Sequence, residues 1–478
     1  MSEQHLKRNL GLIGLIATGA SSMIGASIYI VPFEIQAAVP GLGNNIVFAF
    51  LLAALPALIS AFAYAILSSS MPLAGGSYIY VSRTLHPFFG FISSFSQWFG
   101  LSIVMGVVAY MVTPFMSDIV FHLGFTDASS WLLKGFNRVL ISLTLLWIFV
   151  IINIIGLKSY EAVVVLLVVI TFILGGFVIY YALSNTPEHF SEAMFQKTGE
   201  KIASQPTIFS WDKLVAASSI LFASFIGFDS IAQVGGEAKN PTKNLPAAIL
   251  ITFLIVSLFY LCFTYSIYKI VPWNFIAKEA IEKDVSAVSL LGYMLDGKST
   301  IIILFGACIA LLKDLPSMIL SVSRFVYAWS NDKLFPAVFS KIHTSYHTPH
   351  YAIVFSGSIA SMGVLGCHFA SDIFLGIDIM VISMLVNFIM ICIAVINIPV
   401  SYQQHKISTS IFNNRNSQKT IAYIGILLLL FFLFNIVKND ISTAQESFYF
   451  HPTYVWLMVM LGSAIFYFVN HYVIQKNK

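Results

Sequence analysis

Two long apolar stretches of this sequence are interrupted near their middle by glycine and other small residues. The first runs from Leu10 to Val31 and is interrupted over Ser21 to Ser27, and the second runs from Leu214 to Val234 and is interrupted over Ala223 to Gly227. Inside a bilayer an unpaired backbone amide or carbonyl group costs several kcal/mol, so a helix stays broken only where the freed groups line a protected cavity. Broken helices at matching places in two halves of a chain are typical of a transporter's binding site.

A broken helix offers two electrically opposite ends, because free amides begin one segment and free carbonyls end the other. The amides of Ala26 and Ser27 can hold a carboxylate, as helix N-termini hold anions in general. The carbonyls of Met23, Ala223 and Ile226 can accept hydrogen bonds from an ammonium group. The arrangement therefore matches an amino acid zwitterion.

Glycine at the breaks has two interpretations. Gly25 has no Cβ and would let a ligand approach the backbone closely. The alternative is that Gly25 and Gly227 serve helix packing, since small residues are common where membrane helices touch. Two breaks at corresponding places, with a carboxylate at Asp229 just beyond the second, favour a binding site.

Asp229, Lys313, Asp314 and Asp378 all fall within apolar stretches. A charged group near the centre of a bilayer costs at least about 2.5 to 3.5 kcal/mol on insertion scales, so such residues are paired, hydrated or functional. Neighbours on a helix point about 100° apart, so Lys313 and Asp314 are not expected to pair with each other. We expect these four residues to act in coupling or in side-chain recognition, where Asp314 and the small Ala223 favour a large or cationic side chain. The alternative is a buried ion pair of Lys313 with Asp229 or Asp378 that only locks helices together.

The composition excludes an ordinary soluble domain. Of the 478 residues, 58% are hydrophobic and 10% are charged, and the mean hydropathy is +0.86. Windows long enough to cross a hydrocarbon core of about 30 Å recur about twelve times. They cover approximately residues 10–32, 44–69, 87–121, 137–156, 160–184, 210–236, 245–272, 298–330, 351–369, 373–400, 420–437 and 453–474.

The distribution of Lys and Arg predicts the orientation. These residues concentrate in the connections that face the cytoplasm if the N-terminus lies inside, so both termini are expected there, in a multi-pass protein of the cytoplasmic membrane. Arg83, Glu237, Lys243 and Arg324 are expected to form a cytoplasmic gate of opposite charges. The alternative is that each is an anchor or an orientation signal.

The first ten spans divide into two sets of five, each opened by a broken helix. Because five is odd, the second set would enter the bilayer from the opposite side, as an inverted repeat. The fold class predicted is an all-α polytopic membrane protein of about twelve transmembrane helices, with spans 1 and 6 broken and two peripheral helices that serve as scaffold or homodimer contact. The predicted units are residues 1–184 (first repeat), 185–209 (outer loop), 210–403 (second repeat) and 404–478 (peripheral spans and cytoplasmic C-terminus).

Four segments resemble signatures of the amino acid, polyamine and organocation permease superfamily, and the resemblance covers most of residues 8–350. Ile24 to Tyr29 is similar to the family's Gly-Ser-Gly-Ile-Phe signature, and Met71 to Tyr80 is close to its Pro-x-Ala-Gly-Gly-x-Tyr-x-Tyr pattern. Gly236 to Pro246 looks like its Glu-x-x-Asn-Pro-x-Arg-x-x-Pro loop, and Ser323 to Pro336 closes the eighth span in the same way.

The resemblance implies a leucine-transporter-like fold and transport of amino acids by alternating access. Some proton-coupled relatives carry a lysine in the fifth span in place of a sodium ion, whereas the residue aligned here is Thr171, which argues against that device. The substrate contacts that the resemblance implies are Met23, Ile24, Gly25, Ala26, Ser27, Ala223, Phe225, Ile226, Gly227 and Met318.

The sequence therefore predicts a secondary active transporter of amino acids, working by proton-coupled symport or by exchange for a counter-substrate. A polyamine or organic-cation transporter of the same fold is one alternative, and a transport-dead receptor or assembly partner is another. No metal, cofactor or nucleic acid is expected. The chain has no Gly-x-x-x-x-Gly-Lys-Ser/Thr motif for nucleotides and no nucleophile and base signature of an enzyme.

Overall fold

The computed structural model describes residues 6–25, 27–199, 204–282, 285–370, 374–399, 414–442 and 451–476. In this part of the chain the regular structure is helical, and the only β contacts are two isolated bridges. Twelve helical segments are long and apolar enough to cross a membrane, which confirms the fold class predicted from the sequence.

Two of the twelve spans are broken and a third changes helix at a single residue. Span 1 consists of α1 (Leu12–Met23) and α2 (Ser27–Ala38), span 6 of α10 (Trp211–Leu221), the 3-10 turn η2 (Phe222–Phe225) and α11 (Ser230–Gln233), and span 8 of α15 (Gly297–Leu312) and α16 (Asp314–Asn331). The other spans are α3 (Ile46–Ser70), α5 (Pro87–His122), α7 (Phe136–Ile155), α8 (Leu157–Leu183), α12 (Pro241–Ile270), α17 (His350–Ala370), α18 (Phe374–Ile396), α20 (Arg415–Ser442) and α21 (Pro452–Lys476).

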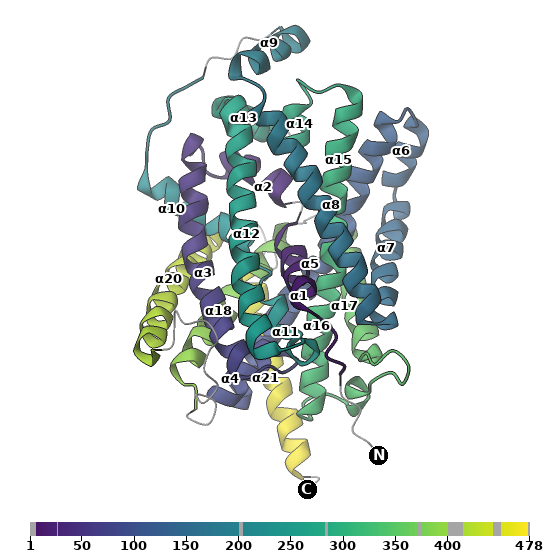
Figure 1. Ribbon diagram of the computed structural model, residues 1–478, viewed down its shortest axis with the longest axis vertical. Helices are drawn as coiled ribbons and strands as arrows, with labels where there is room; N and C mark the ends of the chain where they lie inside the picture. Colours follow the sequence, from purple (N-terminus) through teal and green to yellow (C-terminus); the bar gives the residue numbers. More distant parts are fainter. Residues whose placement is uncertain are drawn as a thin grey trace.

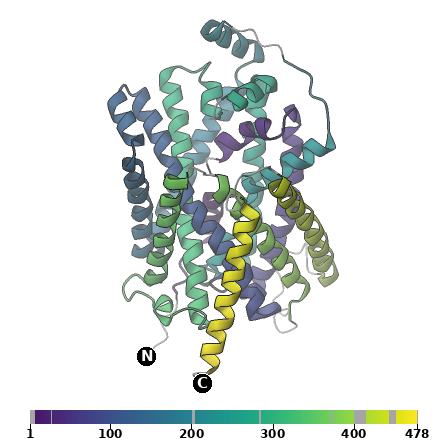
Figure 2. The same cartoon turned by 180° about the vertical axis from the view of Figure 1, so that it is seen from behind.

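The helices form one upright bundle, in which α1 begins and α21 ends at the same end, here called the terminal end (Figures 1 and 2). α5 packs against α15, α16, α17 and α18, and α12 packs against α1, α3 and α8. The breaks themselves are buried among other helices, away from lipid, where free backbone groups would have no partner.

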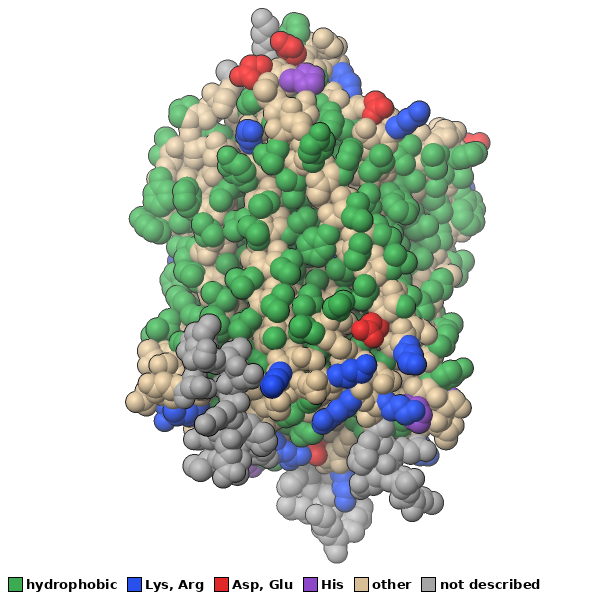
Figure 3. Space-filling view, in the orientation of Figure 1, with side chains coloured by type: hydrophobic (Ala, Val, Ile, Leu, Met, Phe, Trp, Pro, Cys, Tyr) green, Lys and Arg blue, Asp and Glu red, His purple; other side chains and the backbone are tan. Residues whose placement is uncertain are grey.

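The surface also has the pattern of a membrane protein. Hydrophobic side chains cover the middle of the visible face, basic side chains gather toward the terminal end, and most acidic ones lie at the opposite end (Figure 3). A broad apolar belt between two polar ends is the surface that a bilayer requires.

Short helices cover the end opposite the termini. One of them is α13 (Trp273–Glu282), which packs on α2. The predicted outer loop contains α9 (Pro187–Thr198), whose Phe190 packs against Phe275 of α13 with 5.6 Å between ring centroids. Burial of such aromatic pairs fixes both short helices on the bundle.

Candidate functional site

The first break opens the backbone of span 1 next to α12. α1 ends at Met23, Ile24 and Gly25 are not helical, and α2 begins at Ser27. The Ser27 hydroxyl lies 2.7 Å from the hydroxyl of Tyr260, which donates to the carbonyl oxygen of Met23 at 3.2 Å. The two sides of the break are thus bridged through one tyrosine. Ala26, the remaining residue predicted here, lies outside the described residues.

The second break approaches the first backbone to backbone. Gly227 has φ +130°, a conformation that residues with a Cβ rarely adopt. A Cβ built on it would lie 2.4 Å from the carbonyl oxygen of Ser22 and 2.7 Å from the amide nitrogen of Met23. Close approach of the two spans explains the need for glycine here. The carbonyl oxygen of Ile226 accepts no hydrogen bond from any described residue, so it remains available to a ligand.

Lys313 occupies the open carbonyl end of α1. Its fully buried ammonium donates to the carbonyl oxygen of Ser21 at 2.9 Å, to that of Ile24, and to Asp314 Oδ1 at 2.9 Å. The prediction that these neighbours do not pair was wrong, because the long lysine side chain bends back toward the adjacent carboxylate. Of the predicted alternative partners, Asp229 binds Gln97 and Gly227, and Asp378 lines a neighbouring pocket.

Asp229 lies beside the second break and lines the cavity between the two breaks. It lies at the N-terminus of α11 with 1% of its surface exposed, and its Oδ1 accepts from the amide of Gly227 at 3.2 Å. Its Oδ2 accepts from the side-chain amide of Gln97 on α5. A buried carboxylate is tolerated only with such donors, so Asp229 fixes the backbone of the second break.

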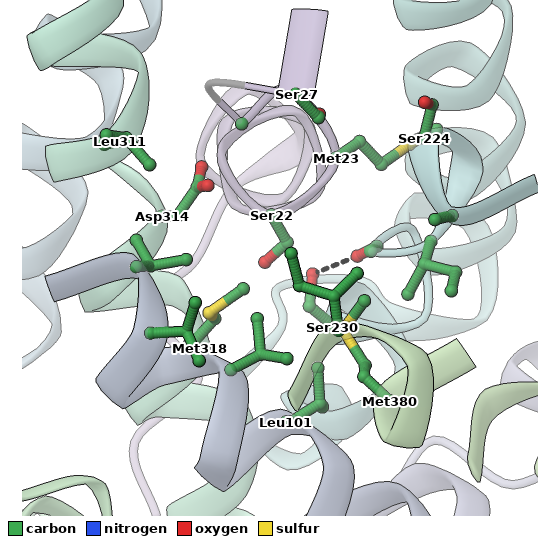
Figure 4. A pocket seen from close by; sticks show the side chains of 18 of the residues that line it. Ser22, Met23, Ser27, Leu101, Ser224, Ser230, Leu311, Asp314, Met318 and Met380 are labelled. Atoms are coloured by element: carbon green, nitrogen blue, oxygen red, sulfur yellow. Dashed lines mark hydrogen bonds between the residues drawn. The ribbon is translucent and has the colours of Figure 1, made fainter. Parts of the chain in front are cut away.

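The two breaks enclose a cavity of about 160 Å³ (Figure 4). The volume is about tenfold the roughly 10–15 Å³ that one water molecule needs. The hydroxyl groups of Ser22 and Ser321 line the cavity and are buried without a hydrogen-bond partner among the described residues, so they are available to a ligand. The apolar side chains of the lining come from α5, α15, α16 and α18: Leu101, Val104, Val107, Val108, Met111, Leu311, Met318, Ile377 and Met380.

The predicted substrate contacts divide as follows. Met23, Gly25, Ser27, Ala223, Ile226, Gly227 and Met318 line this cavity, together with Asp229 and Asp314. Ile24 is buried behind it, where its carbonyl oxygen faces Lys313. Phe225 is buried against Phe50 and Tyr260, so it packs behind the turn and is not part of the lining.

The cavity adjoins a wider vestibule on the side away from the terminal end. This vestibule has a volume of about 440 Å³ and shares Ile30, Val31, Ala223 and Ile377 with the cavity. Asp378 lines the vestibule and is exposed, so it lies outside the cavity in which Asp314 is found. The cavity and the vestibule are therefore neighbours.

A buried ion pair joins α16 to the 3-10 turn η3 (Gly235–Glu237), which follows α11. Arg324 donates to Glu237 through Nη2 at 2.6 Å and Nε at 3.0 Å, and both side chains are fully buried. Of the other two residues predicted for a gate, Arg83 pairs with Asp332 at 3.0 Å, and Lys243 is exposed in the first turn of α12. Sequence reasoning missed Asp332 because its partner lies 249 residues away.

We expect Glu237→Gln to lower the free energy of unfolding strongly. Removing one member of a buried ion pair leaves an uncompensated charge and costs about 3–5 kcal/mol. Thermal unfolding of the purified protein measures the effect. The control is Asp332→Asn at the partly exposed pair with Arg83, where a loss within about 1 kcal/mol is expected. Equal losses in the two variants would contradict the stabilising role given to the buried pair.

Twelve apolar spans around a buried cavity, with two broken spans at the cavity and a vestibule beside it, are typical of a membrane transporter of small solutes. The chain matches the family model described as "Amino acid permease" over residues 10–461, and it belongs to that family. The protein is a permease that transports amino acids, and it is not an enzyme.

Three relatives illustrate the range of the family. The branched-chain amino acid permease BcaP of Lactococcus lactis is 29% identical over 353 residues, which cover 72% of each chain. The serine/threonine exchanger SteT of Bacillus subtilis is 25% identical over 76% of this chain and 78% of its own. The low-affinity putrescine importer PlaP of Escherichia coli is 24% identical over 76% of each chain.

Proposed function

We propose that this permease carries amino acids with aliphatic side chains across the cytoplasmic membrane by alternating access. The observation that supports the proposal is the cavity itself, where backbone groups of two broken spans meet an otherwise apolar lining. The main-chain carboxylate would lie at the N-terminus of α2, and the ammonium group at the carbonyl of Ile226 and the hydroxyl groups nearby. The relative BcaP is named for branched-chain amino acids, which agrees with this choice.

A cationic substrate fits the cavity less well. A buried cation needs a carboxylate partner, and the charge of Asp314 is already balanced by the ammonium group of Lys313. This pairing argues against the cationic side chain that Asp314 favoured in the sequence.

A thermal-shift screen of the purified protein against all amino acids and common polyamines tests the substrate class. A ligand present at about 100 times its Kd stabilises the native state by about 2.7 kcal/mol. We expect Leu, Ile, Val and Met to raise Tm, and Arg and putrescine to leave it unchanged. A response to Arg or putrescine alone would overturn the choice, and no response together with no flux into liposomes would favour a transport-dead receptor.

For coupling, we propose that the Lys313–Asp314 pair does the work that a bound sodium ion or a span-5 lysine does in relatives. Its ammonium group already neutralises the carbonyl end of α1, so uptake should be unchanged when choline replaces sodium. Coupling would then come from protons or from a counter-substrate.

We expect Asp314→Asn to abolish the acceleration of leucine uptake by a pH gradient while leucine exchange continues. The variant removes the carboxylate that can take up a proton, but it leaves the ammonium group bound to Ser21 and Ile24. Radiolabelled leucine uptake into proteoliposomes, with and without the gradient, measures both activities. Unchanged acceleration in the variant would assign proton coupling elsewhere.

The surface charges support a cytoplasmic position for the terminal end. Basic side chains gather there (Figure 3), and Lys and Arg favour the cytoplasmic side of membrane proteins. In this orientation the vestibule opens outward and the Glu237–Arg324 pair closes the inner side, with both termini in the cytoplasm. We further propose that residues 1–184 and 210–403 are inverted repeats, and that α20 and α21 serve as scaffold or contact in a homodimer.

A further inference from the structure

A ring of hydrogen bonds surrounds the short helix α11. Asn387 of α18 donates through its side-chain nitrogen to Gln97 Oε1 at 2.9 Å and to the hydroxyl of Tyr64 on α3 at 2.7 Å. Tyr64 lies 2.7 Å from the hydroxyl of Ser77, which accepts from the side-chain amide of Gln233 at 2.9 Å. Gln97 also donates to Asp229, the residue that precedes α11. Gln233 is the last residue of α11, so the helix itself completes the ring.

Every side chain of the ring is buried, with at most 1% of its surface exposed. Hydrogen bonds in such a low-dielectric interior are strong, and an unpaired amide there is costly. Because Asn387 uses both donors of its side-chain amide and accepts from Ser93 at 2.7 Å, its orientation is fixed. Gln97 is oriented in turn, since its oxygen accepts from Asn387 and its nitrogen donates to Asp229.

The two ends of α11 have different neighbours. At the first end Asp229 accepts from the amide of Gly227, which lines the substrate cavity. At the other end the carbonyl oxygen of Gln233 accepts from the amide of Gly75 at 2.9 Å, next to the closed terminal end. α11 has only four residues, so it cannot stand alone as a helix and takes its position from these contacts.

We propose that this ring couples the substrate cavity to the closure of the terminal end, and that Gln97 and Asn387 are positioning residues of the transport cycle. The inference rests on the proposed alternating access. A substrate that moves the Gly227 backbone displaces Asp229, and the ring transmits the displacement to Gln233 and Gly75. Without the ring, substrate binding and the opening of the terminal end would become independent.

The test uses Asn387→Leu, Gln97→Met and the isosteric Tyr64→Phe, which removes a single hydroxyl and is the variant that best preserves folding. Leucine binding by the purified protein and transport in proteoliposomes are measured separately. In Asn387→Leu and Tyr64→Phe, which leave both donors of Asp229 in place, we expect Kd to stay within about threefold. We expect kcat to fall at least about tenfold in Asn387→Leu and Gln97→Met and by less in Tyr64→Phe. Because these residues belong to one series of hydrogen bonds, kcat of the double variant Asn387→Leu/Gln97→Met should fall no further than that of either single variant.

Access to the cavity gives a second readout. Ser321→Cys places a thiol in the cavity, in a background with the exposed Cys262 replaced by serine. A membrane-impermeant thiol reagent is added from the terminal end. It should modify this cysteine slowly when the ring is intact, and at a rate at least about fivefold higher in the ring variants. The matched control is Asn153→Leu, which removes a buried amide bonded to the carbonyl of Pro316 outside the ring.

Unchanged reactivity together with unchanged kcat in Tyr64→Phe and Asn387→Leu would overturn the coupling role. The same would follow from effects no larger than those of Asn153→Leu. If the proposed function itself is wrong, the protein with an intact ring would neither bind nor transport leucine, which distinguishes that failure from the loss of coupling.

Discussion

Gly227→Ala is expected to lower leucine transport at least about 100-fold and to abolish leucine binding. The added Cβ would lie 2.4 Å from the carbonyl oxygen of Ser22, which belongs to a backbone that cannot rotate away. The φ of +130° adds strain of about 1–3 kcal/mol, and overpacking costs a similar amount. The only relief is to separate the two breaks, which destroys the cavity between them.

Gly176→Ala is the matched control for this variant. Gly176 lies in α8, and a Cβ built on it meets no atom within 4 Å. Alanine there should leave transport unchanged and should support the helix. If Gly227→Ala bound leucine with the affinity of the unmodified protein, the close contact of the two breaks would not be part of the site.

The second large effect is expected for Lys313→Met, which should transport at below about 1% of the rate of the unmodified protein. Methionine leaves the carboxylate of Asp314 and the carbonyls of Ser21 and Ile24 buried without their cation. Loss of one partner of a buried ion pair costs about 3–5 kcal/mol, so Tm should fall as well. Thermal unfolding and proteoliposome uptake measure the two losses.

The double variant Lys313→Met/Asp314→Asn separates stability from transport. Removing both charges should restore most of the Tm, because no unpaired ion remains. Transport should stay low, since the carbonyl end of α1 still lacks a cation. Lys298→Met, at an exposed lysine in the first turn of α15, controls for the loss of a lysine. Rapid transport by the single Lys313 variant would contradict the role given to its ammonium group.

The sequence predicts the spans and both breaks, because these depend on local composition. Glycine and serine inside a long apolar window are visible without a fold, and the structure interrupts the helix at Ile24 and Gly25 and again at Ile226 and Gly227. The apolar windows themselves agree with the twelve spans.

The partners of the charged residues were harder to predict, since they depend on how spans far apart in the chain pack together. The ammonium of Lys313 meets the carbonyl of Ile24 across 289 residues, and α5 supplies Gln97 to Asp229 across 132. For the same reason the pairing of Arg83 with Asp332 could not be predicted. Gln97 and Asn387 were visible as rare amides in apolar spans, and that signal could have marked the ring.

The most direct test of the central claim compares the binding of leucine with that of two analogues by calorimetry. 3-Methylbutylamine lacks the carboxylate and 4-methylpentanoate lacks the ammonium group, while both keep the aliphatic chain. If the two breaks hold both charged ends of the zwitterion, each analogue should bind at least about 100-fold more weakly than leucine, a difference of about 2.7 kcal/mol. Binding of either analogue within about threefold of leucine would contradict the site.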